Sequence, residues 1–201
     1  MELWQYEQEA AAAGRSVICG CDEAGAGPLA GPVYAAAVVL PMGLEIPGLN
    51  DSKKLTEKKR EQLFPVIKEL AVEWSVASVS AQEIDETDIL SARMKTMQLA
   101  IDGLSRTPDF ALIDGNKDHG RTAAITTEHR CIVKGDSLSA SIAAASILAK
   151  VSRDHLMLEL AEQYPQYRFE KHKGYGTKLH YEMLREYGPC PIHRMTFLKK
   201  L

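Results

Sequence analysis

The sequence predicts an α/β fold in which a mixed β-sheet is flanked by helices, with a helical C-terminal part. Short apolar runs bounded by glycine and other turn residues indicate buried strands, and longer segments with apolar residues three or four positions apart indicate helices. The first two strands follow each other directly, whereas the later strands alternate with helices and a helix-rich stretch ends the chain. This order favours a mixed sheet over a doubly wound parallel one.

The first 50 residues predict one helix and one pair of strands. Residues 1–14 are rich in alanine and favour a short helix that ends at Gly14. Strands are expected over 17–22 and 33–40, and because only a glycine-rich turn separates them, they are expected to pair antiparallel. Residues 41–50 contain glycines and prolines that predict a loop.

The next segment predicts two helices separated by a strand. Thr56 is expected to cap the first helix, and residues 73–80 alternate between apolar and small polar side chains as a strand does. Ser80 and Glu83 have the spacing of a capping box, and apolar residues recur at helical spacing over 89–104. Three apolar side chains of the first helix are expected to be buried: Leu63, Ile67 and Leu70.

The second half predicts two more strands and a central helix. Residues 110–113 and 123–133 are apolar runs next to turn residues and predict strands. A long helix is expected to start at Ser137 or Ser139 and to end before Pro165. Because its first half is apolar nearly all round, this helix is expected to pack against the middle of the sheet.

Composition and charge limit the kind of protein. The chain has 201 residues, of which 45% are hydrophobic and 25% charged, and these are ordinary values for a globular domain. No apolar run is long enough to cross a bilayer and no secretory leader is evident, so we expect a cytoplasmic protein without membrane contact. A net charge of −3 argues against nucleic-acid binding by overall charge, but local basic clusters such as residues 171–173 remain candidates for phosphate contact.

Four carboxylates fall at or just after the ends of three predicted strands. Asp22 and Glu23 end the first strand, Asp114 follows 110–113, and Asp136 follows the last strand. If these strands are neighbours, the four acids meet in one pocket and repel each other unless cations are present. Magnesium bridging the carboxylates and a substrate phosphate resolves that repulsion, and two such ions can activate water for phosphodiester hydrolysis.

Each acid taken alone has an ordinary explanation. Asp22 and Glu23 could be a solvated pair before a turn, Asp114 begins an Asp-Gly-Asn turn signature, and Asp136 could cap a helix. Their convergence is what favours a metal site. Thiol, serine and zinc mechanisms lack their usual residue spacing in this sequence.

Several motifs in register resemble the ribonuclease HII family. They are Asp22-Glu23-Ala24-Gly25-x-Gly27-Pro28-Leu29-Ala30-Gly31-Pro32, Asn50-Asp51-Ser52-Lys53-Lys54-Leu55, Asp114-Gly115-Asn116, Lys134-Gly135-Asp136-Ser137, the Ala-Ala-Ala-Ser-Ile-Leu-Ala-Lys helix with Arg153-Asp154, and His172-Lys173-Gly174-Tyr175-Gly176-Thr177. The resemblance implies a ribonuclease H-like fold. It also implies a catalytic domain over 1–164 and a helical C-terminal extension over 165–201 packed on that domain. The residues themselves predict a helix over 177–187 in this extension, ended by Gly188 and Pro189.

The resemblance implies a metal-dependent endoribonuclease. Such an enzyme cuts on the 5′ side of ribonucleotides embedded in duplex DNA and in RNA–DNA hybrids, leaving a 3′-hydroxyl and a 5′-phosphate. Its role would be the removal of ribonucleotides from DNA and the degradation of RNA primers. By the resemblance, Asp22, Glu23, Asp114 and Asp136 are catalytic and hold Mg²⁺ or Mn²⁺, with two ions in the substrate complex. We expect a monomer whose partners are these nucleic acids.

The resemblance also implies substrate contacts. Tyr175 would stack on the sugar next to the RNA–DNA junction and, with the backbone of Gly25, Ala26 and Gly27, sense the 2′-hydroxyl, the group that distinguishes RNA from DNA at a site. Without the resemblance, Tyr175 is an ordinary surface tyrosine. Four further residues are expected to contact the substrate: Asn50, Lys53, Ser139 and Lys173.

The chain departs from the family in one loop residue. The family's loop is Gly-Arg-Gly, whereas this chain has Ala26 between Gly25 and Gly27. Loss of one charged hydrogen bond costs about 1.5–3 kcal/mol, so we expect a working but weakened enzyme with poorer discrimination of the junction. Three alternatives remain: a catalytically impaired hybrid-binding protein on the same fold, a DNA-directed nuclease, and a nucleotide-binding enzyme, although the loop lacks the residues typical of phosphate cradles.

Overall fold

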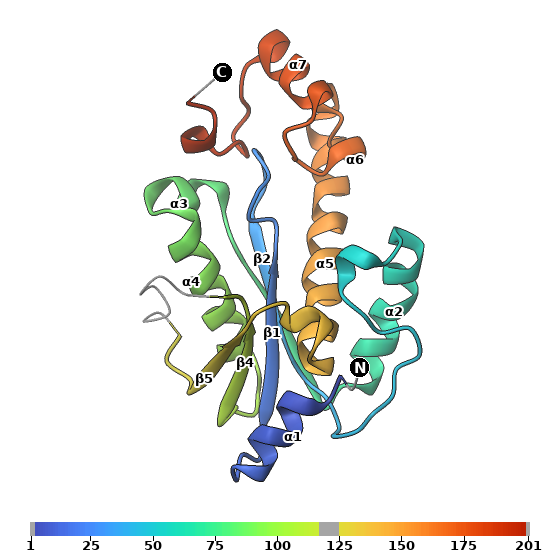
Figure 1. Cartoon of the computed structure of the whole chain (residues 1–201). Coiled ribbons are helices and arrows are strands. Elements are labelled where there is room, and N and C mark those ends of the chain that lie inside the picture. The colour runs from blue at the N-terminus through green and yellow to red at the C-terminus, as the bar shows by residue number, and fades with distance from the viewer. Residues whose placement is uncertain (1–2, 117–124, 200–201) are drawn as a thin grey trace.

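A mixed β-sheet is the centre of the computed structural model, which describes residues 3–116 and 125–199 (Figure 1). Within these residues the sheet has five strands in the order β3-β2-β1-β4-β5. The strands are β1 (Ile18–Ala24), β2 (Val33–Val39), β3 (Glu73–Val79), β4 (Phe110–Asp114) and β5 (His129–Ile132). Strand β1 pairs antiparallel with β2 and parallel with β4. The predicted mixed sheet and the predicted β1–β2 pairing are confirmed.

Helices cover both faces of the sheet. They are α1 (Gln5–Ala12), α2 (Glu57–Leu70), α3 (Ala81–Glu86), α4 (Ile89–Asp102), α5 (Ala140–Gln163), α6 (Phe169–His172) and α7 (Lys178–Tyr187). Helices α2 and α5 pack on one face through the side chains of Ala36 and Val38. Helix α4 packs on the other face, where Cys19, Cys21 and Ala37 are buried. Alternate residues of each strand therefore point to α5 and to α4.

Helix α5 runs alongside the central strands β1 and β2 (Figure 1). A Cβ atom at Gly20 of β1 would lie only 2.2 Å from the carbonyl carbon of Ser141, so the absence of a side chain at Gly20 lets the start of α5 touch the strand. Ser139 caps α5 by accepting a hydrogen bond from the Ile142 amide. The predicted apolar central helix is confirmed, with Ser139 as its start.

The structure corrects three details of the sequence prediction. Leu70 is 41% exposed rather than buried, because it is the last residue of α2 and its side chain extends past the core. The single helix expected after Ser80 is two helices, since Asp88 caps α4 with hydrogen bonds from the amides of Leu90 and Ser91. Strand β5 begins at His129 instead of residue 123, and residues 123 and 124 lie outside the described part of the chain.

The C-terminal helices pack on the far end of α5. Residues of α5, α7 and the segment around Tyr167 and Phe169 form one apolar cluster with Leu29 and Ala30. The loop after β1 is thereby joined to the C-terminal part, and Figure 1 shows both at the same end of the molecule. Over the described ranges, no helix has the length and apolar character needed to span a membrane.

Candidate nuclease site

Three aspartates gather at the carboxyl ends of the parallel strands. One carboxylate oxygen from each of Asp22, Asp114 and Asp136 lies within 4.8 Å of those of the other two. Asp22 belongs to β1 and Asp114 ends β4, and the register of these strands pairs the residues just before them, Cys21 and Ile113. The parallel pairing therefore places the two aspartates side by side on the α5 face of the sheet.

Asp136 reaches this cluster through a tight turn after β5. The turn passes through Lys134 in the left-handed conformation, at φ 58°, and continues into a short 3-10 helix, Gly135–Ser137. The amides of Gly135 and Asp136 donate hydrogen bonds to Oδ1 of Asp114 at 2.7 and 3.4 Å. Asp114 thus also holds the turn that presents Asp136.

Glu23, the fourth predicted carboxylate, is not one of the three acids that converge, although its charge and that of Asp114 still act on each other. Because it follows Asp22 in a strand, its side chain points to the opposite face of the sheet, where Arg93 of α4 forms an ion pair with it at 2.5 Å. Glu23 Oε2 and Arg93 Nε are buried and have no hydrogen-bond partner among the described residues. Burial raises the pKa of Glu23, while Arg93 acts in the opposite direction.

The aspartate cluster is electrostatically unfavourable without a cation. Burial, and after it the charges of Glu23 and Asp114, raise the pKa of Asp22 well above the usual range of an aspartate. Burial and Asp114 likewise raise the pKa of Asp136. Burial alone would lower the pKa of Lys53, but the aspartates raise it overall. Three hard carboxylate oxygens at this spacing fit a divalent ion such as Mg²⁺ or Mn²⁺.

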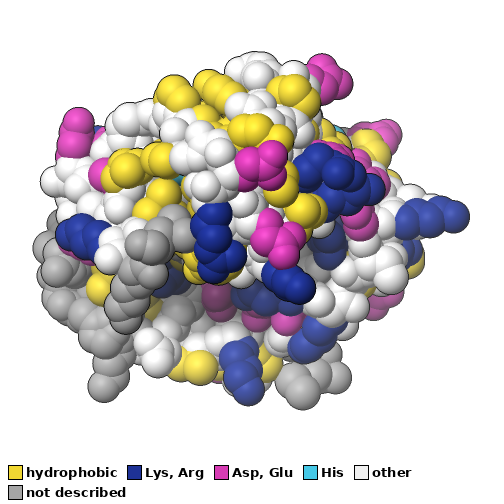
Figure 2. Space-filling view, turned by 90° about the horizontal axis from the view of Figure 1, so that it is seen from above, with side chains coloured by type: hydrophobic (Ala, Val, Ile, Leu, Met, Phe, Trp, Pro, Cys, Tyr) yellow, Lys and Arg dark blue, Asp and Glu magenta, His cyan; other side chains and the backbone are white. Residues whose placement is uncertain are grey.

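Basic side chains border the cluster. A recess of about 330 Å³ is lined by Asp51, Lys53, Lys54, Asp114, Lys134, Asp136 and Ser137. The Nζ atom of Lys53 lies 3.4 Å from Oδ2 of Asp136, while most of the lysine side chain is exposed. A phosphate could enter this recess and meet both the ammonium groups and a carboxylate-bound metal. Figure 2 views the molecule from above and shows lysine and arginine side chains interleaved with acidic ones across the middle of that face.

The glycine-rich loop and Tyr175 lie against each other. The amide of Leu29 donates to the carbonyl of Gly174 at 2.8 Å, which fixes the loop beside the segment that carries Tyr175. Tyr175 is 41% exposed, and Lys150 and Arg153 place their charged groups 5.7 and 5.8 Å from the centre of its ring. Gly27 is exposed. The loop backbone and an aromatic ring therefore form one continuous surface.

The remaining predicted contacts differ in how they are placed. Lys53 is at the aspartate cluster, and Asn50 is exposed nearby in sequence, with its side chain accepting a hydrogen bond from the Asp51 amide. The Lys173 ammonium donates to the carbonyl of Glu170 at 2.8 Å. Ser139 is completely buried, and its hydroxyl bonds to Glu7. The structure therefore does not bring Ser139 to a surface that a nucleic acid could reach.

Sequence reasoning missed two residues that contact the site, Arg93 and Arg194. Arg93 is the partner of Glu23, and Arg194 donates hydrogen bonds to the carbonyls of Gly25 and Ala26. Charged residues in a helix or a polar tail are usually solvated, so neither carried a signal in the sequence.

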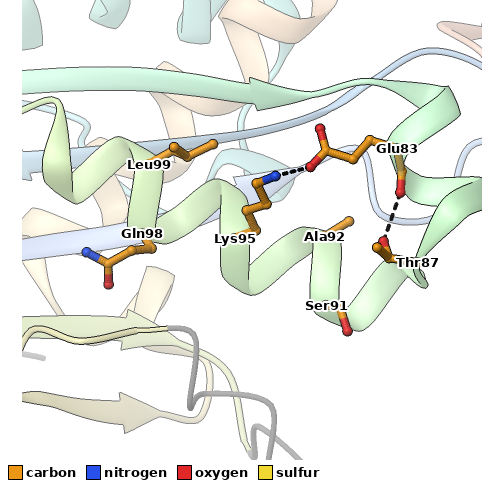
Figure 3. A pocket seen from close by; sticks show the side chains of 7 residues that line it. All are labelled: Glu83, Thr87, Ser91, Ala92, Lys95, Gln98 and Leu99. Carbon is orange, nitrogen blue, oxygen red and sulfur yellow. Dashed lines mark hydrogen bonds and ion pairs between the residues drawn. The ribbon is translucent and has the colours of Figure 1, made fainter.

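A second depression lies along α3 and α4 (Figure 3), and none of the three aspartates lines it. It is lined by Glu83, Thr87, Ser91, Ala92, Lys95, Gln98 and Leu99. In Figure 3, Lys95 and Glu83 point toward each other and form an ion pair. Because its single carboxylate is already paired with a lysine, this depression is not a candidate for metal-dependent chemistry.

Comparison with known proteins finds similar sequences over nearly the whole chain. The family model described as Ribonuclease HII matches residues 19–200. Ribonuclease HII of Endomicrobium trichonymphae is 58% identical over 90% of this chain and 84% of its own length, and that of Acetivibrio thermocellus is 51% identical over 99% of this chain and 76% of its own.

Solved structures show the same fold. The crystal structure of ribonuclease H2 from Pyrococcus horikoshii has a TM-score of 0.74 and 28% identity, over 90% of this chain and 93% of that one. The ribonuclease HII in a complex with PCNA from Archaeoglobus fulgidus has a TM-score of 0.73 and 26% identity, over 92% of this chain and 96% of that one. The chain described here belongs to the ribonuclease HII family and is a type 2 ribonuclease H, an endoribonuclease with the ribonuclease H-like fold.

Proposed function

We propose that this ribonuclease hydrolyses the phosphodiester on the 5′ side of ribonucleotides embedded in duplex DNA and in RNA–DNA hybrids. The products would be a 3′-hydroxyl and a 5′-phosphate, and the role would be removal of ribonucleotides from DNA and degradation of RNA primers. The observation that carries the proposal is the convergence of Asp22, Asp114 and Asp136 within 4.8 Å of one another. Phosphodiester hydrolysis by divalent metals uses such a carboxylate set.

The three aspartates are proposed to hold Mg²⁺ or Mn²⁺, with two ions in the substrate complex. Bound there, the metal would act as a Lewis acid and lower the pKa of water. Glu23 belongs to the proposed catalytic set: Arg93 pairs with its Oε1, and its buried Oε2, which has no hydrogen-bond partner among the described residues, is the oxygen proposed to reach a metal. Lys53, beside Asp136, is proposed to contact a substrate phosphate.

Recognition of the ribonucleotide is assigned to the loop and the exposed tyrosine. Tyr175 is proposed to stack on the sugar at the junction, while the backbone of Gly25, Ala26 and Gly27 contacts the 2′-hydroxyl. The hydrogen bond between Leu29 and Gly174 supports this, since it joins the glycine-rich loop to the segment that carries Tyr175. Asn50 and Lys173 are proposed as weaker phosphate contacts.

An impaired hybrid-binding protein is the alternative, because Ala26 stands where the family's loop has an arginine. The intact aspartate cluster favours the enzyme. The domain division at residue 164, the monomeric state and the cytoplasmic location remain predictions.

Three end-labelled substrates separate the possible activities: a DNA duplex with one ribonucleotide, an RNA–DNA hybrid, and the DNA duplex alone. Each is incubated with Mg²⁺, with Mn²⁺ and with chelator. The proposal predicts metal-dependent cleavage of the first two only. Cleavage of the all-DNA duplex would identify a DNA-directed nuclease, and binding without any cleavage would identify the impaired binder.

A further inference from the structure

Two arginine side chains are completely buried beneath the glycine-rich loop, residues 25–32. Arg153 belongs to α5 and Arg194 to the C-terminal segment, and both are 0% exposed. The ion pairs found among the described residues include neither of them. A buried charge without an ionic partner is costly unless hydrogen bonds replace its hydration.

Backbone carbonyls supply those hydrogen bonds. Arg194 donates three, to the carbonyl oxygens of Gly31 (2.9 Å), Ala26 (3.0 Å) and Gly25 (2.6 Å). Arg153 donates three, to those of Pro32 (3.0 Å), Lys173 (3.0 Å) and Ala30 (3.1 Å). All of these acceptors except Lys173 lie in the loop. Two guanidinium groups therefore hold the loop through five of its carbonyls, in addition to the backbone hydrogen bonds of Leu29 and Gly31.

Glycines make the close approach possible. A Cβ at Gly25 would lie 2.1 Å from Nε of Arg153, and a Cβ at Gly174 would lie 2.4 Å from the carbonyl oxygen of Ala30. Both glycines also have positive φ, +93° and +86°, which disfavours other residues. The loop and the segment before Tyr175 consequently touch through backbone atoms.

Arg153 connects the glycine-rich loop to the segment that carries Tyr175. One of its nitrogens bonds to the carbonyl of Lys173, two residues before Tyr175, and another bonds to Ala30 in the loop. Because the guanidinium is planar and rigid, bonds from one group to both segments limit their relative movement. Its carbon atom also lies 5.8 Å from the centre of the Tyr175 ring.

We propose that Arg153 and Arg194 are positioning residues for ribonucleotide recognition. They turn the loop carbonyls inward and hold the loop in register with Tyr175, so discrimination depends on two groups that the substrate does not touch. The inference rests on the proposed function, because it takes the loop and Tyr175 as the surface that meets the ribonucleotide.

The test uses Arg153→Lys and Arg194→Lys, which keep the charge and lose the planar fork. Arg106→Lys is the matched control, since Arg106 is exposed and precedes β4, at the end of the sheet opposite the aspartates. On a duplex with one ribonucleotide, we expect KM to rise at least ~10-fold in both test variants, with kcat within ~3-fold. The control should match the wild type. An unchanged KM, or a loss confined to kcat, overturns the proposal.

Amide hydrogen exchange tests, without substrate, whether the arginines hold the loop against the segment that carries Tyr175. The amides of Leu29 and Gly31 bond to the carbonyls of Gly174 and Ile192, and in the lysine variants we expect them to exchange at least ~10-fold faster while β1 is unchanged. Unchanged exchange overturns the proposal. If the wild type cuts no ribonucleotide, the proposed function fails, and the exchange result still decides whether the arginines hold the loop.

A third variant covers the case in which the lysine variants do not fold. Gly174→Ala places a Cβ against the Ala30 carbonyl and separates the loop from Tyr175 without changing either arginine. KM on the single-ribonucleotide duplex should again rise at least ~10-fold. A wild-type KM in Gly174→Ala would show that the register does not matter for recognition.

Discussion

Asp22 and Glu23 are neighbours in β1 and both feel the charges of Asp114 and Lys53, yet their carboxylates have different partners. Asp22 faces Asp114 and Asp136 on the α5 side of the sheet, whereas Glu23 forms an ion pair with Arg93 of α4. The cause is strand geometry, since adjacent side chains point to opposite faces. The two acids should therefore respond differently to substitution.

Substitution of Arg93 should destabilise the protein. Arg93→Met removes the partner of a buried carboxylate, and loss of one member of a buried pair costs about 3–5 kcal/mol. Urea unfolding measures this cost. The double variant Arg93→Met with Glu23→Gln should recover much of it, because no charge is then left unpaired. If the two changes add without recovery, Glu23 and Arg93 are not coupled.

Asp22→Asn should abolish cleavage and stabilise the metal-free protein. We expect activity to fall at least ~10³-fold through loss of a metal-binding charge, and Mn²⁺ binding, followed by calorimetry, to weaken as well. Without metal, removal of the repulsion should raise the free energy of unfolding at pH 8 by at least about 1 kcal/mol, or ~2–4 °C in Tm. If Asp22→Asn has a lower Tm than the wild type in chelator, repulsion among the aspartates does not destabilise the metal-free protein.

The pH dependence of that gain has a defined sign. The pKa of Asp22 is raised in the folded protein. The wild type is therefore most stable at low pH, where Asp22 is protonated, and its free energy of unfolding falls as pH rises through the folded pKa. The Tm difference between Asp22→Asn and wild type in chelator should therefore grow as pH rises from 4 to 8. A constant difference would point to a change in packing instead.

Acid should destabilise the folded protein through a buried histidine, His180, of the C-terminal part. Burial, with smaller effects from His172 and His193, lowers the pKa of His180 to about 4. Because the pKa is lower in the folded protein, His180 contributes to the free energy of unfolding at pH values above 6.5, its pKa in the unfolded chain. This contribution, up to roughly 3 kcal/mol, is lost as pH falls toward 4. His180→Asn keeps an N–H for the Tyr175 carbonyl and should flatten the pH dependence of urea unfolding in this range. If the free energy of unfolding of the variant changes with pH as steeply as that of the wild type, His180 is not the cause of the acid sensitivity.

Ala26→Arg should improve the enzyme. A guanidinium at this partly exposed loop position is expected to add one charged hydrogen bond to a substrate phosphate, worth about 1.5–3 kcal/mol, or roughly 10- to 100-fold in kcat/KM. Steady-state kinetics on a duplex with one ribonucleotide measures the gain, and Ala26→Gln is the control for side-chain bulk. No gain over wild type would mean that Ala26 costs nothing.

Local signals made most of the fold predictable. Thr56 and Ser80 each cap the helix that they were expected to start, and Ser139, one of the two expected starts, caps α5, because capping depends on residues only three positions apart. Helix α6 and the separate helix α3 were missed, since each is short, six residues for α3 and four for α6, and such lengths give too few turns for an apolar pattern to recur. Leu70 satisfied the periodicity, but burial also depends on whether another element covers that position.

The candidate site was predictable only in part. Asp22, Asp114 and Asp136 each follow an apolar run, and parallel strands bring such ends together. The ion pair of Glu23 joins residues 70 positions apart, and the carbonyl ligands of Arg194 come from a loop more than 160 residues earlier. Contacts of this kind depend on tertiary packing and leave no pattern in the sequence.

The most direct measurement is the position and end chemistry of a single cut. A DNA duplex with one internal ribonucleotide is labelled at either end and incubated with Mg²⁺ or with chelator, with Asp136→Asn as the control. We predict one Mg²⁺-dependent cut on the 5′ side of the ribonucleotide, a 3′-hydroxyl that a polymerase can extend, and no cut by the variant. Duplex binding without cleavage, or equal cleavage of the all-DNA duplex, would contradict it.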